Sequence, residues 1–202
     1  MIYRCYHPNV PRLERRERER SERRQAILTA ARELAESEGW QAVTTRRLSD
    51  RIEYSQPVLY SHFENRDAII EAVALEGFSE LSVVMHDGKS RARTPEAALR
   101  GTAKAYVEFA EANPALYDAM FTLATDLPFG RPETPVQLRR AFDEIHKAVE
   151  PLARSRDSET LTEVVWSSLH GLASLARAGR LRTNLQDKRL AILVDLLKGG
   201  GG

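Results

Sequence analysis

The stretch that decides the fold is residues 43–67, which read VTTRRLSDRIEYSQPVLYSHFENRD. Either Thr44 or Thr45 is suited to cap a helix, because a threonine hydroxyl accepts a hydrogen bond from a free N–H of the first turn. Ser55 can cap a second helix in the same way, and Pro57 then occupies its first turn without losing a needed N–H bond. The sequence therefore predicts two short helices that are joined by a tight turn.

The register of the second helix decides which side chains face solvent. Leu59 and Phe63 lie four residues apart, so they share one helix face. We expect this face to pack inward against Leu48 and Ile52 of the helix before it. The opposite face then consists of Gln56, Pro57, Val58, Tyr60, Ser61 and His62. These side chains suit DNA, since a glutamine amide can make paired hydrogen bonds to an adenine edge and hydroxyl groups can reach phosphates.

A preceding and a following helix complete the expected arrangement. The preceding helix is expected to run from Ser21 to Glu38 and to stop at Gly39. The following helix is expected to begin after a cap on Asn65 and to continue to about His86. Such an arrangement presents one helix to a DNA major groove, and the free N–H groups that open the following helix favour a phosphate. The expected DNA-contacting residues are Thr45, Arg46, Arg47, Ser55, Gln56, Pro57, Val58, Tyr60, Ser61, His62 and Arg66.

The same stretch resembles the tetracycline-repressor (TetR) family of one-component transcriptional regulators. The residues that carry the resemblance are Thr44-Thr45, Leu48, the string Ser55-x3-Leu59-Tyr60-x-His62-Phe63, Arg66 and Ile69. It covers about Arg24 to Val73. The resemblance implies a homodimer that binds a palindromic operator in double-stranded DNA and responds to a small-molecule effector. A repressor released by its effector and an activator both stay open.

The stretch departs from the family pattern at two points. Family members hold a small residue, a glycine and an apolar residue in the turn, whereas this chain has Ile52-Glu53-Tyr54. They also keep a lysine where Arg66 stands, which preserves the charge but changes the contact geometry. The glutamate in the turn leaves open how tightly the turn closes, and it favours one alternative, a helical interaction module without DNA binding.

The remainder of the chain reads as helical, because apolar residues recur at helical spacing and period-two alternation is hardly seen. The predicted fold is therefore all-α, with about nine helices. The further helices are expected at 95–112, 114–125, 135–155, 157–178 and 185–198, with loops at 87–95 and 126–134. The expected parts are an N-terminal arm at 1–20, a helix-turn-helix DNA-binding domain at 21–67, a regulatory and dimerisation domain at 68–198 and a disordered tail at 199–202.

The C-terminal half contains a surface that suits a second protomer. The string Trp166-x3-His170-Gly171-Leu172, followed by Ala178-Gly179-Arg180-Leu181, resembles the regulatory domain of a TetR subgroup named for its Trp-His-Gly pattern. The helix expected at 157–178 is apolar on more than one face, which predicts a partner, although a wide intramolecular core is the alternative. Two protomers would then form a four-helix bundle. The expected interface residues are Leu161, Val165, Leu169, Leu172, Leu193, Leu196 and Leu197.

An effector is expected among the C-terminal helices, where it would shift the population between two arrangements of the DNA-binding parts, with the fourth helix as the lever. The candidate lining residues are Tyr106, Phe109, Tyr117, Met120, Phe121, Phe142, His146, Trp166 and His170. Aromatic residues at this spacing are also typical of a plain core. A largely apolar effector fits such a lining. His146 and His170 have no carboxylate or cysteine at ligand spacing, so neither a metal nor another cofactor is expected.

Charge is unevenly distributed along the 202 residues, although the formal net charge is only +1. Through Arg66 there are 13 basic and 10 acidic residues, whereas the remainder has 17 basic and 19 acidic residues. Seven arginines lie between Arg12 and Arg24. Such a tract indicates either a solvated helix or disordered arm, or an arm that follows DNA phosphates.

Other classes of protein are disfavoured by what the sequence lacks. The apolar stretches are too short for a bilayer span, and the N-terminus has no apolar centre of a secretory signal. Cys5 is the single cysteine and can form no internal disulfide, so a cytoplasmic location is expected. There is no phosphate-binding loop and no nucleophile with a placed base, which argues against an enzyme.

Overall fold

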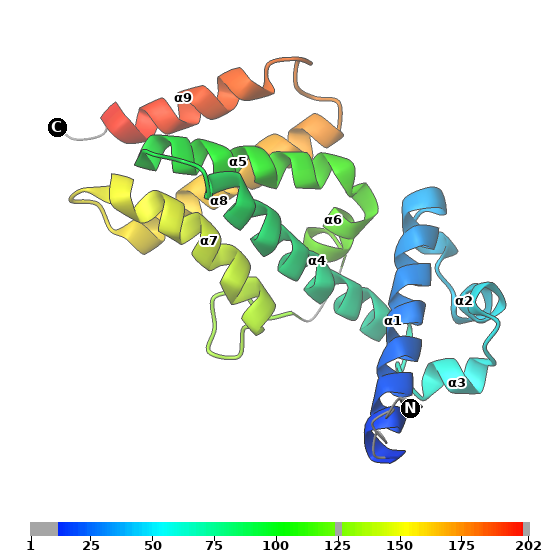
Figure 1. Ribbon diagram of the computed structural model, residues 1–202. Coiled ribbons are helices and arrows are strands. Elements are labelled where there is room, and N and C mark those ends of the chain that lie inside the picture. Colours follow the sequence, from blue (N-terminus) through cyan, green and yellow to red (C-terminus); the bar gives the residue numbers. More distant parts are fainter. Residues whose placement is uncertain (1–11, 124–126, 200–202) are drawn as a thin grey trace, which may run out of the picture. The chain divides into compact units, whose positions relative to one another are not determined.

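The computed structural model describes residues 12–123 and 127–199. All regular secondary structure in these ranges is helical. Within these ranges the chain forms nine α-helices and one short 3-10 helix, which confirms the expected all-α fold (Figure 1). The chain divides into two compact units, Met1–Ile69 and Ile70–Gly202. No helix in the described ranges is both long enough and apolar enough to cross a bilayer.

The first unit is built on one long helix. Its elements are α1 (Arg12–Glu38), the 3-10 helix η1 (Trp40–Ala42), α2 (Thr45–Ile52), α3 (Gln56–Tyr60) and the opening of α4 (Arg66–Lys89). The expected start of the first helix at Ser21 was wrong, because the helix already begins at Arg12. Arginine and glutamate are good helix formers, and pairs such as Arg15–Glu19 stabilise successive turns. The expected arm is therefore helical from residue 12, and its residues 1–11 lie outside the described ranges.

A single core joins the helices of this unit. Ile27 and Leu34 of α1 are seven residues apart and share a face, and both are buried. Leu48 of α2 and Leu59 of α3 are also buried, and α2 packs against both α1 and α3. Gly39 ends α1 with a positive φ of 83°, as expected for a C-terminal stop. These contacts fix α3 through α2 onto the long helix.

The turn between α2 and α3 is tight despite its glutamate. Glu53 adopts the left-handed conformation, with φ 55° and ψ 32°, and its N–H donates to the carbonyl of Ser49. This conformation is the one for which family members keep a glycine, since a Cβ makes it unfavourable. The turn nevertheless closes, which removes the sequence-based reason to suspect an altered helix-turn-helix.

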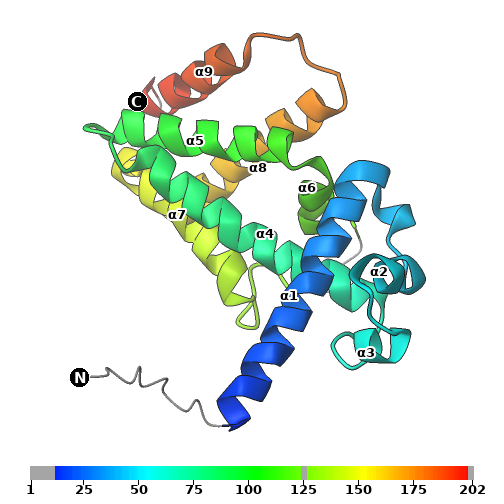
Figure 2. The same cartoon turned by 45° about the vertical axis from the view of Figure 1, so that its right-hand side comes forward.

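The second unit packs around α5. It contains α4 from Ile70 onward, α5 (Pro95–Ala112), α6 (Pro114–Phe121), α7 (Val136–Ala153), α8 (Ser158–Arg177) and α9 (Gln186–Gly199). α5 packs against α7, α8 and α9, and both views show α9 running alongside it (Figures 1 and 2). The bounds expected for α5 are confirmed, whereas α6 ends at Phe121 instead of residue 125. Gly199 belongs to α9, and residues 200–202 of the expected tail lie outside the described ranges.

The start of the expected loop at 87–95 was also wrong, because α4 continues to Lys89. Gly88 of α4 lies against Gly101 of α5, so closely that a Cβ on Gly101 would overlap the carbonyl oxygen of Gly88. A long-range cluster fixes the same end of α4 to α7, since the Glu144 carboxylate binds Lys89 at 2.6 Å and Lys147 at 2.7 Å. Burial alone would raise the pKa of Glu144, but the two lysines lower it to about 2.

Candidate nucleic-acid interface and ligand cavity

The N-termini of α2 and α3 are capped differently. Thr44 is the N-cap of α2, and its hydroxyl accepts a hydrogen bond from the Arg47 N–H at 3.3 Å, which confirms one of the two expected caps. Ser55 is the N-cap residue of α3, but its side chain makes no capping bond. Its exposed hydroxyl therefore stays available at the surface beside Gln56.

The orientation expected for α3 is confirmed. The side chain of Leu59 is 0% exposed and Phe63 is also buried, whereas Tyr60 is 51% exposed. Ile52 is half-buried instead of fully inward. Gln56, Pro57 and Ser61 are exposed, and Val58 and His62 are half-buried. α3 ends at Tyr60, earlier than expected, and residues 61–62 continue as a turn.

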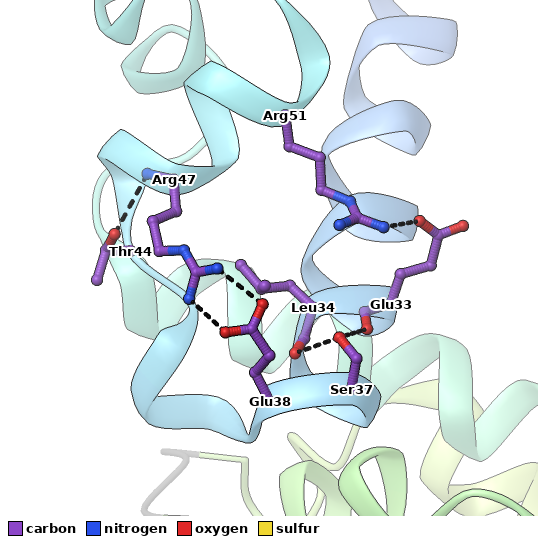
Figure 3. Close-up of polar contacts among 7 residues, drawn as sticks. All are labelled: Glu33, Leu34, Ser37, Glu38, Thr44, Arg47 and Arg51. Carbon is purple, nitrogen blue, oxygen red and sulfur yellow. Dashed lines mark hydrogen bonds and ion pairs between the residues drawn. The ribbon is translucent and has the colours of Figure 1, made fainter.

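Two arginines of α2 are bound to α1 (Figure 3). The Arg47 guanidinium donates to both carboxylate oxygens of Glu38, at 2.9 and 2.7 Å, and Arg51 donates to Glu33 at 2.9 Å. The hydrogen bonds from Arg47 lower the pKa of Glu38. Arg47 thus helps to fix α2 to α1, and both Arg47 and the neighbouring Arg46 are exposed, so the expected DNA contacts of these two arginines stay predictions. Glu38 lies nine residues before Arg47, and no local pattern indicates this pairing.

Arg66 also has an intramolecular role. Its Nε donates to the carbonyl of Val43 at 2.9 Å, and its Nη2 donates to the carbonyl of Trp40 at 2.7 Å. Arg66 thus ties the opening of α4 to the segment before α2, and its expected phosphate contact stays a prediction. Asn65 caps α4 as expected, since its side-chain oxygen accepts from the Ala68 N–H at 2.9 Å.

His62 lies beside arginines of α1. The Arg24 guanidinium lies 4.3 Å from the centre of the Phe63 ring, and it donates to the His62 carbonyl at 3.4 Å. Partial burial lowers the pKa of His62, and the positive charges of Arg20, Arg23 and Arg24 lower it further. His62 is therefore neutral at pH 7, in a strongly basic surrounding that helical periodicity alone did not reveal.

Two adjoining cavities lie within the second unit. Their volumes are about 490 and 650 Å³, and Phe121, Phe129 and Trp166 line both. Of the expected lining residues, these cavities bring together Tyr106, Met120, Phe121, Phe142, Trp166 and His170. The lining residues that sequence reasoning missed include Phe78, Phe129, Arg131, Arg139, Glu159 and Glu163.

Three expected lining residues do not border these cavities. Phe109 is buried in the core. Tyr117 lies behind the wall, where its ring stacks on that of His170. His146 is hydrogen-bonded to Thr162 at 3.1 Å. Among the described residues there is no group of three potential metal ligands.

A chain of hydrogen bonds runs through the cavity wall. Trp166 Nε1 donates to the Tyr106 hydroxyl at 3.3 Å, because an indole N–H can only donate. The Tyr106 and Tyr117 hydroxyls lie 3.0 Å apart, and either of them can donate to the other. The Tyr117 oxygen lies 2.7 Å from Nδ1 of His170, and Nε2 of His170 lies 3.4 Å from the Ser174 hydroxyl. Hydrogen bonds thus link five side chains in series.

The pKa shifts keep the members of this chain uncharged. Burial raises the pKa of Tyr106 to about 12 and the pKa of Tyr117 well above its usual value, so both hydroxyls keep their protons. Burial also lowers the pKa of His170, and the nearby charge of Arg177 lowers it further. His170 is therefore neutral at pH 7, and one of its ring nitrogens can accept a hydrogen bond.

Both units match models of known families. A model described as "Bacterial regulatory proteins, tetR family" matches residues 27–73. A second, described as "Tetracyclin repressor-like, C-terminal domain", matches residues 99–197. The two ranges do not overlap and together take in well over half of the chain. The chain belongs to the TetR family. The resemblance drawn from residues 43–67 is confirmed, and the Trp-His-Gly subgroup stays a prediction.

Two curated relatives share part of this TetR-family chain. The HTH-type transcriptional regulator YobS of Bacillus subtilis is 36% identical over 93 residues, which is 46% of this chain and 48% of that protein. Tetracycline repressor protein class C of Escherichia coli is 43% identical over 51 residues, 25% of this chain and 23% of that protein. The match thus spans about half the length of the first relative and about a quarter of the second.

Solved structures share the fold over most of the TetR-family chain. A protein from Rhodococcus sp. RHA1 has a TM-score of 0.73 at 23% identity, covering 88% of this chain and 94% of its own. The TetR-family regulator PfmR of Thermus thermophilus has a TM-score of 0.61 at 20% identity, covering 87% and 98%. FadR of Bacillus subtilis, solved in complex with stearoyl-CoA, has a TM-score of 0.65 at 10% identity, covering 88% and 99%. At these identities the likeness establishes the fold.

The residues expected at a TetR-type dimer interface fall into two groups. Val165 (0% exposed), Leu169 and Leu197 (7% exposed) are buried in the second unit, so assigning them to a free surface was wrong. Leu161, Leu172 and Leu193 are half-buried, and Leu196 is 67% exposed. The apolar side chains that are exposed on these helices, and that sequence reasoning missed, are Val164, Leu175 and Ile192. Periodicity located the helices correctly but did not show which of their faces the protomer itself covers.

Proposed function

We propose that this TetR-family protein is a transcriptional regulator that binds double-stranded DNA through α3. The observation that carries the proposal is the orientation of α3, which buries Leu59 and Phe63 and exposes Gln56 and Tyr60. A short helix held from behind by α1 and α2, with polar side chains outward, suits the major groove. The proposed contacting residues are Thr45, Arg46, Ser55, Gln56, Pro57, Val58, Tyr60, Ser61 and His62.

The test of base reading is the variant Gln56→Ala, measured on sequences selected from random duplex DNA. Loss of a paired hydrogen bond to one base is expected to relax discrimination at that position by about 1–3 kcal/mol, with other positions unchanged. Gln25→Ala, an exposed position of α1, serves as the matched control and should leave the selected sequence intact. An equal loss of affinity on every duplex for Gln56→Ala would contradict base reading by this residue.

The two cavities are proposed to hold a small-molecule effector that releases the protein from DNA. Their linings are mainly aromatic and aliphatic, with charged side chains such as Arg131 and Glu163 at the larger one, which supports a largely apolar molecule with polar groups. The FadR neighbour, with its bound stearoyl-CoA, is consistent with an apolar ligand in this fold. Activation instead of repression is the alternative, and transcription from a promoter that carries the selected site discriminates between them.

The cavity assignment is tested at Ser167, an exposed residue that lines both cavities. A Ser167→Trp variant fills the shared wall and is expected to bind DNA normally while losing at least tenfold in affinity for whichever metabolite releases the wild-type protein. Ser155→Trp adds the same side chain at an exposed position outside these cavities and should respond normally. A normal response from Ser167→Trp would place the effector elsewhere.

A homodimer on a palindromic operator completes the proposal. The exposed Val164, Leu175, Ile192 and Leu196 give α8 and α9 apolar surface that a second protomer can cover. Gly171 of α8 supports the same interface, because a Cβ at this position would meet no atom of the protomer within 4 Å. The small residue leaves room for a helix of the partner to approach. We place the protein in the cytoplasm, where its DNA would lie.

A further inference from the structure

The first turns of α1 carry a row of arginines. Arg16, Arg20 and Arg23 follow one another at helical spacings of four and three residues, so they lie on one face together with Ile27. Ile27 is buried in the core of the first unit. One face of α1 is thus apolar and buried at Ile27, and the same face is basic closer to the N-terminus of the helix. None of the glutamates between residues 14 and 22 falls in this row.

The arginine row, Arg16, Arg20 and Arg23, is exposed and free of carboxylate partners. All three side chains are exposed, and within the described ranges none of them forms an ion pair. Arg15, which lies outside the row, is different because it binds Glu19 at 3.0 Å. Three adjacent unpaired guanidinium groups repel one another, and a bound polyanion would offset this electrostatic repulsion.

The row also lies next to the candidate DNA-reading helix. Arg20 and Arg23, with Arg24, are close enough to His62 to lower its pKa, and His62 follows directly after α3. Arg24 is held on the Phe63 ring and on the His62 carbonyl, which fixes this turn of α1 against the end of α3. In both views the first turns of α1 extend past the level of α3 (Figures 1 and 2). The basic row therefore extends the proposed DNA surface instead of lying apart from it.

We propose that the arginine row of α1 binds the phosphate backbone of the duplex that flanks the groove read by α3. The inference rests on the proposed DNA binding and adds a second contact surface to it. From Arg16 to Arg23 the helix rises by about 10 Å, which matches about three successive phosphates of one strand measured along the duplex axis. Guanidinium groups suit this task because they stay charged and bind phosphate oxygens in pairs.

The test compares two double variants that remove the same charge from the same part of α1. Arg20→Gln/Arg23→Gln changes the row, whereas the opposite-face variant, Arg15→Gln/Arg18→Gln, changes two arginines outside the row with the same spacing. Both are measured in the full-length protein, because all four positions are exposed and neither variant disturbs the core. The probes are a selected duplex with long flanks and the same duplex trimmed to its core, each titrated over a range of salt concentrations.

The expected result is specific to the row and to the flanks. On the long duplex, the row variant should lose roughly tenfold in affinity for each phosphate contact at about 0.1 M salt, and its salt slope should fall by about 0.9 per contact. On the trimmed duplex it should bind like the wild type, with unchanged base preference. The opposite-face variant should match the wild type on both duplexes.

Several results would overturn the inference. Equal affinities and slopes for the row variant and the wild type on the long duplex would remove the second contact surface. An equal loss of affinity for the long duplex in both variants would show that only the net charge of α1 matters, and not the position of the row. Loss of binding to anionic lipid vesicles in the row variant, with DNA binding unchanged, would assign the row to a membrane surface. If Gln56→Ala alters base preference while the row variant has no effect, only this inference fails; if the wild type binds no duplex, the proposed function fails with it.

Discussion

At the scale of single residues, α3 is oriented by side chains of its own stretch, whereas α2 and the opening of α4 are held by partners that are more distant in sequence. The shared buried face of Leu59 and Phe63 can be predicted from their spacing alone, because a helix brings residues four apart onto one face. Arg47 binds Glu38, and Arg66 binds two backbone carbonyls. Such partners become available only when the chain has folded, so no local pattern indicates them.

Glu53 leads to a prediction about stability. A left-handed conformation costs a residue with a Cβ about 1–2 kcal/mol, whereas glycine adopts it freely but loses more backbone entropy on folding. Glu53→Gly is therefore expected to raise the free energy of unfolding by about 1 kcal/mol in a urea titration. Asp50→Gly, at an exposed position inside α2, should lower it by about the same amount. A destabilised Glu53→Gly variant would contradict the strain at this turn.

His170 leads to a prediction about pH. Its folded-state pKa lies below the ordinary value of 6.5, so the unfolded chain binds the proton more readily than the folded chain. This contribution to stability is complete above pH 6.5 and is lost as the pH falls from there through the folded pKa. Protonation makes both ring nitrogens of His170 donors, so Nδ1 can no longer accept a hydrogen bond from the Tyr117 hydroxyl.

The measurement is the unfolding free energy of the wild type and of His170→Gln between pH 7.5 and pH 5. A glutamine oxygen can still accept from Tyr117 but does not titrate, so the variant should lose less stability over this range. His62→Gln serves as the comparison, because the pKa of His62 is lowered in the same direction at a separate site. Identical pH dependences for the wild type and His170→Gln would refute the assignment.

At the scale of helices, the start and stop signals were reliable where a side chain supplies them. Pro95 opens α5 behind a Thr94 cap, and the expected bounds of that helix hold. The start of α1 was missed because a run of arginine and glutamate is equally typical of a solvated helix and of a disordered arm. The end of α4 was missed because Gly88 reads as a loop residue until its packing partner is known.

The contact between Gly88 and Gly101 yields a prediction for this pair of helices. A methyl group at Gly101 would overlap the backbone of α4, and a backbone cannot move aside as a flexible side chain can. Gly101→Ala is therefore expected to destabilise the protein by about 1–3 kcal/mol or more, although alanine is the better helix former. Arg100→Ala, exposed on the same turn, should change stability by less than about 0.5 kcal/mol. Equal stabilities of Gly101→Ala and the wild type would show that α4 and α5 can separate at no cost.

At the scale of the whole molecule, the sequence predicted an apolar excess on the last helices, but not which of the apolar side chains are exposed. Val165, Leu169 and Leu197 were assigned to the interface because they repeat at helical spacing, and they fill the protomer core instead. Periodicity cannot separate two apolar faces of one helix, since both faces show the same spacing. The structure distinguishes the two faces by the exposure of their side chains. The proposed dimer can therefore be tested by substitutions on the exposed face.

Two neighbouring leucines of α9 differ only in the face that they occupy. Leu196 is 67% exposed, whereas Leu197 is 7% exposed. Leu196→Glu is expected to keep the folded protomer while shifting the protein from dimer to monomer at micromolar concentrations, because a charge at a protein interface must lose its water. Leu197→Glu buries the same charge inside the protomer and should lower the free energy of unfolding by several kcal/mol.

Sedimentation velocity over a concentration series, together with urea unfolding, separates the two effects. For Leu196→Glu, affinity for a palindromic site should fall much more than affinity for a single half-site, because only the palindrome needs two linked protomers. A Leu196→Glu protein that remains dimeric and binds the palindrome like the wild type would remove α9 from the interface. The apolar residues exposed on α8, Val164 and Leu175, would then have to form it without α9.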